Sequence, residues 1–331
     1  MLDSPTVGQA VEDMFNRPDA EGVSLALVVA QHGDVVVERY GVQPPNILQP
    51  EPVAITADTQ LISWSVAKSV THAVVGLLVA DGRLDPWQPA AVPAWSGTEK
   101  DAITVLDLLE LRSGLRFVED YEDAGTSDVI EMLFGSGIAD HAEFAADMPL
   151  EHPPGRVWSY ASGSTNIVCR IIGDVLSGGP DTAAADREAA VRQYLDERLF
   201  GPSGMAGADP RFDLAGNWVG SSYLYATARE YARFGELYLR DGCAGDVRVL
   251  PEGWVDHART FAARDPETGM HYGRHWWMWP DQPRSLAAHG YEGQYVLVLP
   301  EQDAVLVHLG KTGASARDLL RARLRRVLDS L

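Results

Sequence analysis

The chain is poor in cysteine, and it has no long apolar run. Its 331 residues include only two cysteines, Cys169 and Cys243, which are too few and too far apart for a disulfide framework, and no C-x-x-C pair occurs. No apolar segment approaches the roughly 20 residues needed to span a bilayer. Residues 1–15 lack the basic and apolar regions of a signal peptide. These absences argue against a disulfide scaffold and a membrane protein, and they predict a cytoplasmic location.

Positive charge is scarce as well. The chain has 27 Lys and Arg residues against 47 Asp and Glu residues, a formal net charge of −20 at pH 7. Nucleic acid and anionic membranes would both repel such a chain, so neither is expected as a partner. A small-molecule substrate is the expected partner, and a homodimer stays open.

The motifs of two hydrolase classes are missing. No G-x-S-x-G segment is present, which argues against an α/β-hydrolase. His271 and His275 are four residues apart, but H-E-x-x-H is absent and no carboxylate cluster completes a zinc site. We therefore expect no metal and no cofactor, and we interpret these two histidines as lining or packing residues.

Strand-like segments gather near the two ends of the chain. Segments 23–30 and 34–40 flank a hairpin signal, and three more strands are expected at 285–289, 294–299 and 304–309. Neither group can bury its faces alone. The sequence therefore predicts an α/β (α+β) fold with one five-stranded antiparallel sheet, covered by terminal helices at 5–16 and 314–331. Residues 1–62 and 276–331 would form this sheet domain, residues 63–275 an inserted, mainly helical domain, and the active site would lie at their junction.

One helix begins with a serine and a lysine that its apolar surroundings do not explain. Residues 66–78 repeat apolar side chains at helical spacing. Ser65 and Lys68 are three residues apart, so both lie on one face of this helix. Burial would keep the Lys68 amine largely neutral, and a neutral amine beside a hydroxyl is a base beside a nucleophile. The alternative is a helix-capping serine with a lysine that reaches out to solvent.

Two later segments favour the catalytic interpretation. Tyr160 lies in the turn-rich stretch 153–163 among small residues, which leaves its phenol uncovered, although a loop tyrosine usually packs its ring. Residues 288–294, Ala-His-Gly-Tyr-Glu-Gly-Gln, stand at a strand edge where glycines let the backbone approach a ligand closely.

The three motifs together resemble those of the serine β-lactamase and penicillin-binding-protein superfamily. They are Ser65-x-x-Lys68, Tyr160-Ala161-Ser162 and His289-Gly290, in that order. The chain looks most like the class C-related branch, with its family VIII-type esterases and 6-aminohexanoate-dimer hydrolases. The resemblance covers roughly residues 23–311 and includes segments 63–69, 108–115, 225–235 and 289–294. It implies a β-lactamase/transpeptidase-like fold.

The chain departs from the β-lactamase pattern at two motifs. Ser162 stands where those enzymes have asparagine, and His289 stands where they have the lysine of a Lys-Thr-Gly triplet. A literal Lys-Thr-Gly at residues 311–313 follows the last predicted strand, and we interpret it as unrelated to the site. These departures predict β-lactamase or peptidase activity as a weak side reaction at most.

The resemblance implies acyl transfer through an ester on Ser65, a serine hydrolase without a cofactor. Lys68 and Tyr160 would share the base role, with Tyr160 made more acidic by the nearby ammonium. The oxyanion hole would combine the N–H of Ser65 with one near Tyr291 or Glu292. The residues expected to bind substrate or oxyanion are Ser162, His289, Gly290, Tyr291, Glu292, Tyr121, Trp276 and Trp277.

Two function classes remain open. The first is a hydrolase of small esters or short linear amides, including amides like 6-aminohexanoate oligomers, since esters and amides share the acyl-enzyme. The second is a non-catalytic or regulatory binder that retains the fold. The loop 116–128 carries five carboxylates around Tyr121 and would attract a substrate ammonium if it faced the cleft; otherwise it is a solvated acidic loop. The five are Glu119, Asp120, Glu122, Asp123 and Asp128.

Overall fold

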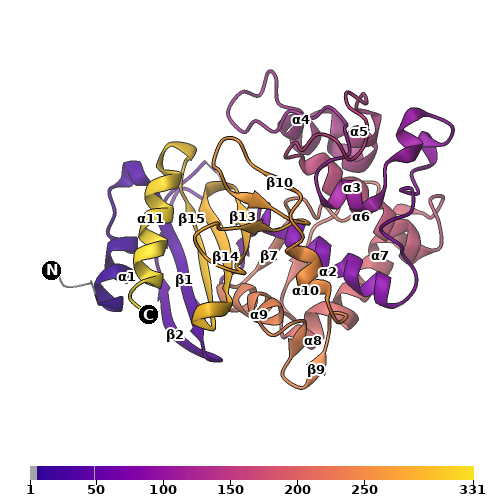
Figure 1. The fold of residues 1–331 in the computed structure, drawn as a ribbon. Coiled ribbons are helices and arrows are strands. Elements are labelled where there is room, and N and C mark those ends of the chain that lie inside the picture. Colours follow the sequence, from indigo (N-terminus) through magenta and orange to yellow (C-terminus); the bar gives the residue numbers. More distant parts are fainter. Residues whose placement is uncertain (1–5, 48) are drawn as a thin grey trace.

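An eight-stranded antiparallel sheet runs through the molecule between a pair of helices and a larger helical region (Figure 1). The structure is a computed structural model that describes residues 6–47 and 49–331. In spatial order the strands are β10 (Ala263–Arg264), β11 (His271–Tyr272), β12 (Trp277–Met278), β13 (Leu286–Gly290), β14 (Gln294–Leu299), β15 (Ala304–Lys311), β1 (Val23–Gln31) and β2 (Asp34–Tyr40).

The fold class is confirmed, but five is too few for the sheet. All five predicted strands are present, as β1, β2, β13, β14 and β15, and β10 to β12 extend the sheet beyond β13. These three extra strands have two residues each, too short to show an alternating pattern. The division into two domains at residues 62 and 276 stays a prediction, and residues 1–5 and 48 of the first lie outside the described residues.

The central strands are apolar on both faces because both faces are covered. Along β1, Leu27 and Val29 belong to one buried cluster, and Ala26 and Val28 belong to another. The first cluster lies under the two terminal helices, and the second includes the helical region. Strand β1 pairs with β15 from Val23–Lys311 to Gln31–Ala304, so segments from opposite ends of the described chain lie side by side in the sheet, next to its β2 edge.

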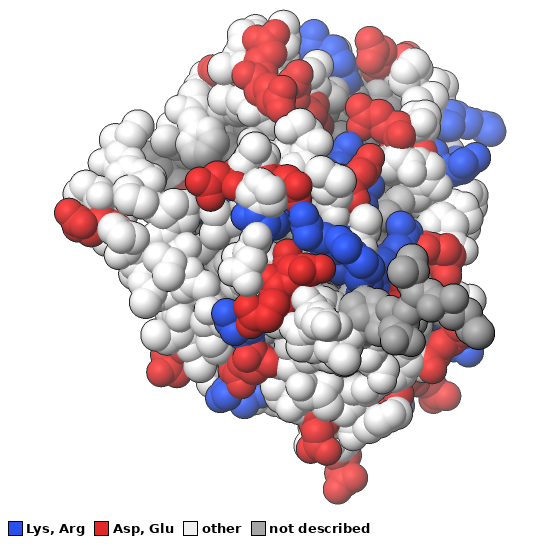
Figure 2. Space-filling model, turned by 90° about the vertical axis from the view of Figure 1, so that its left-hand side faces the viewer, with Lys and Arg blue, Asp and Glu red and all other residues white. Residues whose placement is uncertain are grey.

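Helices α1 (Val7–Phe15) and α11 (Arg317–Leu328) cover the outer face, as predicted (Figure 1). Thr6 and Gln9 form a capping box at the start of α1. Figure 2 shows a band of basic side chains across this face, although the chain is strongly acidic overall. Arginines of α11 contribute ion pairs here, including Arg323 to Glu21 at 2.5 Å.

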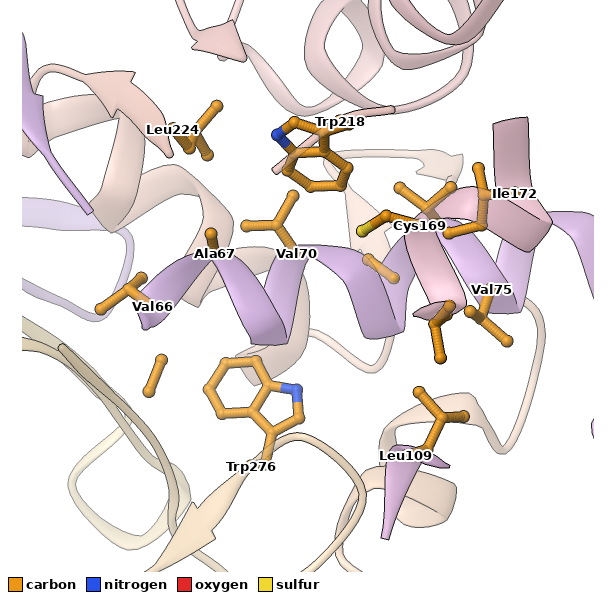
Figure 3. Packing of buried hydrophobic residues seen from close by; sticks show 14 of the residues in the cluster. Val66, Ala67, Val70, Val75, Leu109, Cys169, Ile172, Trp218, Leu224 and Trp276 are labelled. Carbon is orange, nitrogen blue, oxygen red and sulfur yellow. The ribbon is translucent and has the colours of Figure 1, made fainter. Parts of the chain in front are cut away.

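The other face of the sheet meets the helical region, whose central element is α2 (Val66–Ala80). Every residue from 66 to 78 is buried, which suits a helix that is apolar all round. Figure 3 shows Trp276 and Leu109 on one side of α2 and Trp218, Cys169 and Ile172 on the other. The remaining helices are α3 (Val105–Leu109), α4 (Asp128–Phe134), α5 (His141–Asp147), α6 (Ser162–Ser177), α7 (Ala184–Leu195), α8 (Gly201–Ser203), α9 (Ala228–Leu239) and α10 (Trp254–Ala258).

Short strand pairs outside the sheet hold loops in place. They are β3 (Val42–Gln43) with β4 (Val53–Ala54), β8 (Cys243–Ala244) with β9 (Val247–Arg248), and β5 (Leu61–Ile62) and β6 (Asp209–Pro210) on either side of β7 (Leu224–Ala226). The β5–β7 pair matters for the site because it leads directly into α2. The N–H of Ser63 extends this pairing by donating to the Leu224 carbonyl at 2.8 Å. Among the described residues, no helix is both long and apolar enough to cross a membrane.

Candidate active site

The turn before α2 places Ser65 against the end of β13. Trp64 adopts a left-handed backbone conformation with φ of 44°, which costs a non-glycine residue about 1–2 kcal/mol. Its indole packs against Tyr223 and Tyr291, with ring centroids 6.2 and 5.9 Å apart, and this packing offsets the strain. A Cβ on Gly290 would lie 2.4 Å from the Ser63 carbonyl oxygen, so only glycine lets the β13 backbone come this close.

Lys68 lies in the first turn of α2, buried to 1% exposure, and its ammonium nitrogen has three oxygen neighbours. Nζ is 2.9 Å from Ser65 Oγ, 2.9 Å from Ser162 Oγ and 3.0 Å from the carbonyl oxygen of Ser221. Burial lowers the pKa of Lys68 from 10.5 to about 8, against the opposing attraction of the Glu119 carboxylate. A substantial fraction of Lys68 is therefore a neutral amine at mildly alkaline pH, in contact with the Ser65 hydroxyl.

Tyr160 lies beside this pair, and its pKa moves opposite to the prediction. Its ring centroid is 5.0 Å from Lys68 Nζ. Burial raises the pKa of the Tyr160 phenol, the Glu119 carboxylate raises it further, and a hydrogen bond with Ser65 only partly opposes them. The prediction of a more acidic Tyr160 is wrong because burial outweighs any help from the ammonium. Tyr160 is therefore a protonated phenol at the mildly alkaline pH where much of Lys68 is already a neutral amine.

Glu119 completes the network, in a place that its position in the sequence does not predict. Its carboxylate accepts the backbone N–H of Ser162 at 2.7 Å and the Ser162 hydroxyl at 2.5 Å, and it also accepts the hydroxyl of Tyr121. Glu119 is one of five carboxylates on its loop, and nothing local distinguishes it from the other four. The contact between residues 119 and 162 forms only in the tertiary structure, and the spacing of residues along the sequence does not predict it.

The Ser65 hydroxyl opens into a cleft of about 490 Å³. One wall is a stack of three rings, with Trp277 between Tyr160 and His289 at centroid distances of 5.5 and 5.4 Å. Burial lowers the pKa of His289 well below 6.5, and its Nε2 accepts a hydrogen bond from the Trp279 indole N–H at 3.0 Å. The His289 ring is therefore a neutral part of the wall at pH 7 and carries its proton on Nδ1.

Comparison with known proteins identifies the family. A family model described as Beta-lactamase matches residues 11–329. The chain belongs to the beta-lactamase family. It is 27% identical over 303 residues to a 6-aminohexanoate-dimer hydrolase of Paenarthrobacter ureafaciens, covering 86% of this chain and 71% of that protein.

Solved structures of the beta-lactamase fold superpose on nearly the whole chain. An octameric penicillin-binding protein homologue from Pyrococcus abyssi has a TM-score of 0.72 at 18% identity, covering 97% of this chain and 77% of the other. A family VIII carboxylesterase has a TM-score of 0.69 at 15% identity, covering 98% and 96%. These likenesses confirm the predicted fold, and the family model confirms the predicted resemblance to the superfamily.

Most of the site residues predicted from the sequence of this beta-lactamase-family protein lie at the cleft. Those that line it are Ser65, Tyr121, Tyr160, Trp277, His289, Gly290, Tyr291 and Glu292. Three predicted residues do not line it, and one of them is Lys68, which contacts Ser65 Oγ from within α2. Trp276 is fully buried against Phe234 and Tyr238, so it belongs to the core. Ser162 is also fully buried and contacts Lys68 and Glu119 behind the cleft, so it is not a substrate-binding surface.

The literal Lys-Thr-Gly triplet lies nearer the cleft than expected. Lys311 is the last residue of β15 rather than a residue beyond the sheet, and its Nζ is 3.4 Å from the Glu292 carboxylate. Thr312 lines the cleft and its N–H donates to the Glu292 carbonyl at 2.8 Å. Lys311 itself is not among the lining residues.

The acidic loop divides into residues that face the cleft and residues that do not. Glu119, Asp120 and Glu122 line the cleft, whereas Asp123 and Asp128 do not. Asp128 instead accepts the Val118 N–H at 2.7 Å. Acidic residues from elsewhere also line the cleft, namely Asp265, Glu267 and Glu292, together with two basic residues, Arg317 and Arg321. Negative charge therefore predominates around the opening.

The two histidines considered for a metal site have packing partners. His275 is 2% exposed, with Nδ1 2.8 Å from the Leu109 carbonyl and Nε2 3.0 Å from the Thr165 hydroxyl. The His271 ring packs edge-on against Phe261. Across residues 6–47 and 49–331, no three His, Cys, Asp or Glu side chains gather in a way that could hold a metal ion.

Proposed function

We propose that this protein is a serine hydrolase that forms an acyl-enzyme on Ser65 and acts on small esters or short linear amides. The observation that carries the proposal is the 2.9 Å contact between the Ser65 hydroxyl, which opens into the cleft, and a buried Lys68 with a pKa of about 8. A neutral amine in this position can accept the Ser65 proton as the oxygen attacks a carbonyl carbon.

The proposed reaction assigns the other groups by position. The backbone N–H of Ser65 and one at Tyr291 or Glu292 would stabilise the oxyanion, because Gly290 holds β13 against the nucleophile turn. Tyr160, protonated and beside Ser65, would return a proton to the departing alcohol or amine. Lys68 would pass the proton it took from Ser65 to the Tyr160 phenolate, which restores both groups. Water would then attack the Ser65 ester with Lys68 accepting its proton, and that proton would return to the Ser65 oxygen as the acid departs.

Active-site labelling tests the proposal without knowledge of the substrate. A fluorophosphonate probe should label the wild-type protein at Ser65, and Ser65→Ala should abolish both labelling and hydrolysis of p-nitrophenyl esters with the fold intact. An unlabelled wild-type protein would favour the second class, a binding protein that retains the fold. Residual ester turnover within tenfold of wild type in Ser65→Ala would remove Ser65 as the nucleophile.

We further propose that the substrate carries an ammonium group a few carbons from the scissile bond. The support is the predominance of carboxylates around the cleft, including Asp120 and Glu122, together with the similarity to a protein named 6-aminohexanoate-dimer hydrolase. An ammonium close to these carboxylates gains Coulomb attraction that a neutral substrate lacks.

Matched substrates and matched variants test this charge preference. Glu122 is exposed and lines the cleft, so Glu122→Gln should raise KM about 2- to 5-fold for an ω-amino amide, the expected weight of an exposed ion pair. KM for the neutral analogue should not change, and 1 M salt should remove the difference. Asp123→Asn is the control, since it deletes a charge from the same loop away from the cleft. Equal KM values for both substrates would leave the loop outside the binding site.

A further inference from the structure

The oxygen neighbours of Lys68 restrict where its hydrogens can point. The carbonyl oxygen of Ser221, 3.0 Å away, can only accept a hydrogen bond. The hydroxyls of Ser65 and Ser162 can each donate one and accept others. A neutral amine has two hydrogens and one lone pair. Whether it can accept the Ser65 proton therefore depends on which of the three neighbours the lone pair faces.

Glu119 removes the ambiguity at Ser162. The Ser162 hydroxyl has a single hydrogen, which it donates in a hydrogen bond to the carboxylate of Glu119 at 2.5 Å. The Ser162 oxygen can then only accept from Lys68, at 2.9 Å. The backbone N–H of Ser162 also donates to Glu119, and this second bond fixes the carboxylate in place. The Tyr121 hydroxyl is a third donor to Glu119, and three donors on one carboxyl group suit its ionised, acceptor-only form.

We propose that Glu119 is a positioning residue that aims the Lys68 lone pair at Ser65. The Ser162 oxygen and the Ser221 carbonyl oxygen can both only accept hydrogen bonds from Lys68. The two hydrogens of neutral Lys68 are therefore donated to these two oxygens. The lone pair is left facing Ser65 Oγ, ready to accept its proton. This inference rests on the proposed acyl-enzyme function. It also explains how serine can stand at position 162, where the β-lactamases of the superfamily have asparagine.

Glu119 also acts on Lys68 through charge. The titratable groups that act electrostatically on Lys68 or contact it are Glu119, Cys169, Tyr160 and His275. Glu119 opposes the lowering of the Lys68 pKa by burial. Removing the charge of Glu119 should therefore let the Lys68 pKa fall further, so the alkaline rise in activity should start at lower pH. A purely structural role for Glu119 would not move this limb of the pH profile.

Glu119→Gln tests the inference because it keeps the shape and reverses one hydrogen bond. The new amide group donates to Ser162 Oγ, so the Ser162 hydrogen turns toward the Lys68 lone pair and competes with Ser65. We expect the rate of fluorophosphonate labelling and kcat/KM for a p-nitrophenyl ester to fall about 10- to 100-fold at pH 9.5, with the limb of the profile shifted to lower pH. Asp123→Asn, the control, should change neither.

A double-mutant cycle shows whether Glu119 acts through Ser162. In a Ser162→Ala background no hydroxyl hydrogen remains to be redirected, so adding Glu119→Gln should slow labelling at pH 9.5 by less than about 3-fold. Equal losses in both backgrounds, or wild-type labelling in Glu119→Gln, would overturn the inference. Labelling is stoichiometric, so it stays measurable in slow variants. Absence of labelling in the wild type would instead refute the proposed function itself.

Discussion

Lys68 gives the site a defined pH dependence. Its pKa is lowered by burial to about 8, and only the neutral amine can accept the Ser65 proton. We expect kcat/KM to rise about tenfold per pH unit below pH 8 and to level off above it. Lys68→Arg, which cannot be deprotonated, should lose about 10²- to 10⁴-fold. The measurement is a pH–rate profile from 6 to 10, and a flat profile over this range would assign the base role elsewhere.

His289 and Lys311 can be told apart by kinetics. His289 forms part of the cleft wall between Trp277 and Tyr295, so His289→Ala should open a void there and lower kcat/KM about 10- to 100-fold. Lys311 makes only a half-exposed ion pair with Glu292, so Lys311→Ala should stay within about 3-fold of wild type. The reverse order of effects would show that Lys311 occupies the position of the third motif.

At the scale of single elements, α2 tolerates no added bulk where it crosses α10. A Cβ on Gly76 would lie 2.4 to 2.6 Å from three atoms of the Trp254 indole, which is itself held by a hydrogen bond to the His72 carbonyl. Gly76→Ala should therefore lower the free energy of unfolding by about 1–3 kcal/mol, despite the higher helix propensity of alanine.

The control for this prediction is a glycine in another helix. Gly8 lies in α1 and has open space around its Cβ position, with no atom nearer than 4.0 Å. Gly8→Ala should be neutral or stabilise by up to about 1 kcal/mol. Urea denaturation of both variants checks the pair, and similar changes in both would mean that packing against Trp254 does not limit α2.

The sequence predicts those elements whose pattern is long enough to read. Strands of five to nine residues and the buried α2 show clear periodicity, whereas β10 to β12, with two residues each, do not. Trp276 and Trp277 show a second limit. Neighbouring residues at a strand point to opposite sides, so one of the two had to face the core and the other the cleft. The sequence contains no signal for which, and the structure buries Trp276.

The sequence predicts site residues that belong to a short sequence motif, but not those whose role depends on a contact in the folded protein. Ser65, Lys68 and Tyr160 came from short motifs with a recognisable order along the chain. The role of Glu119 depends on contact with Ser162, 43 residues away. The pKa of Tyr160 was misjudged for the same reason, because it follows from burial and from the Glu119 carboxylate, which only the folded chain brings together.

For the molecule as a whole, buried histidines should make the fold sensitive to acid. Burial lowers the pKa of His275 and of His257 from 6.5 to about 3, and it lowers the pKa of His72 well below 6.5. Because the unfolded chain binds these protons more readily, the stabilisation is complete above pH 6.5 and is lost as pH falls toward 3. Each fully buried histidine should remove about 1.4 kcal/mol per pH unit in this window.

Denaturation series between pH 7.5 and 4.5 check this dependence. His275→Asn should give a shallower loss of stability with falling pH than wild type, and asparagine suits the left-handed backbone there, where φ is 56°. His32→Gln is the control, because His32 is largely exposed and pairs only with Asp303 at the surface. Its slope should match wild type. Identical slopes in all three proteins would place the acid sensitivity in the carboxylates instead.

The pairing of β1 with β15 has a consequence for how the protein folds. Ser24 and His308 are hydrogen-bonded neighbours separated by 284 residues of chain. During synthesis, the β1–β2 hairpin therefore leaves the ribosome long before β15 has been made. Until β15 pairs with β1, the apolar side chains of the hairpin stay exposed to solvent. Contacts between such distant parts of a chain form slowly. We expect folding to be slow and prone to aggregation in its early stages, with the sheet beside Ser65 assembled only after the last strand is made.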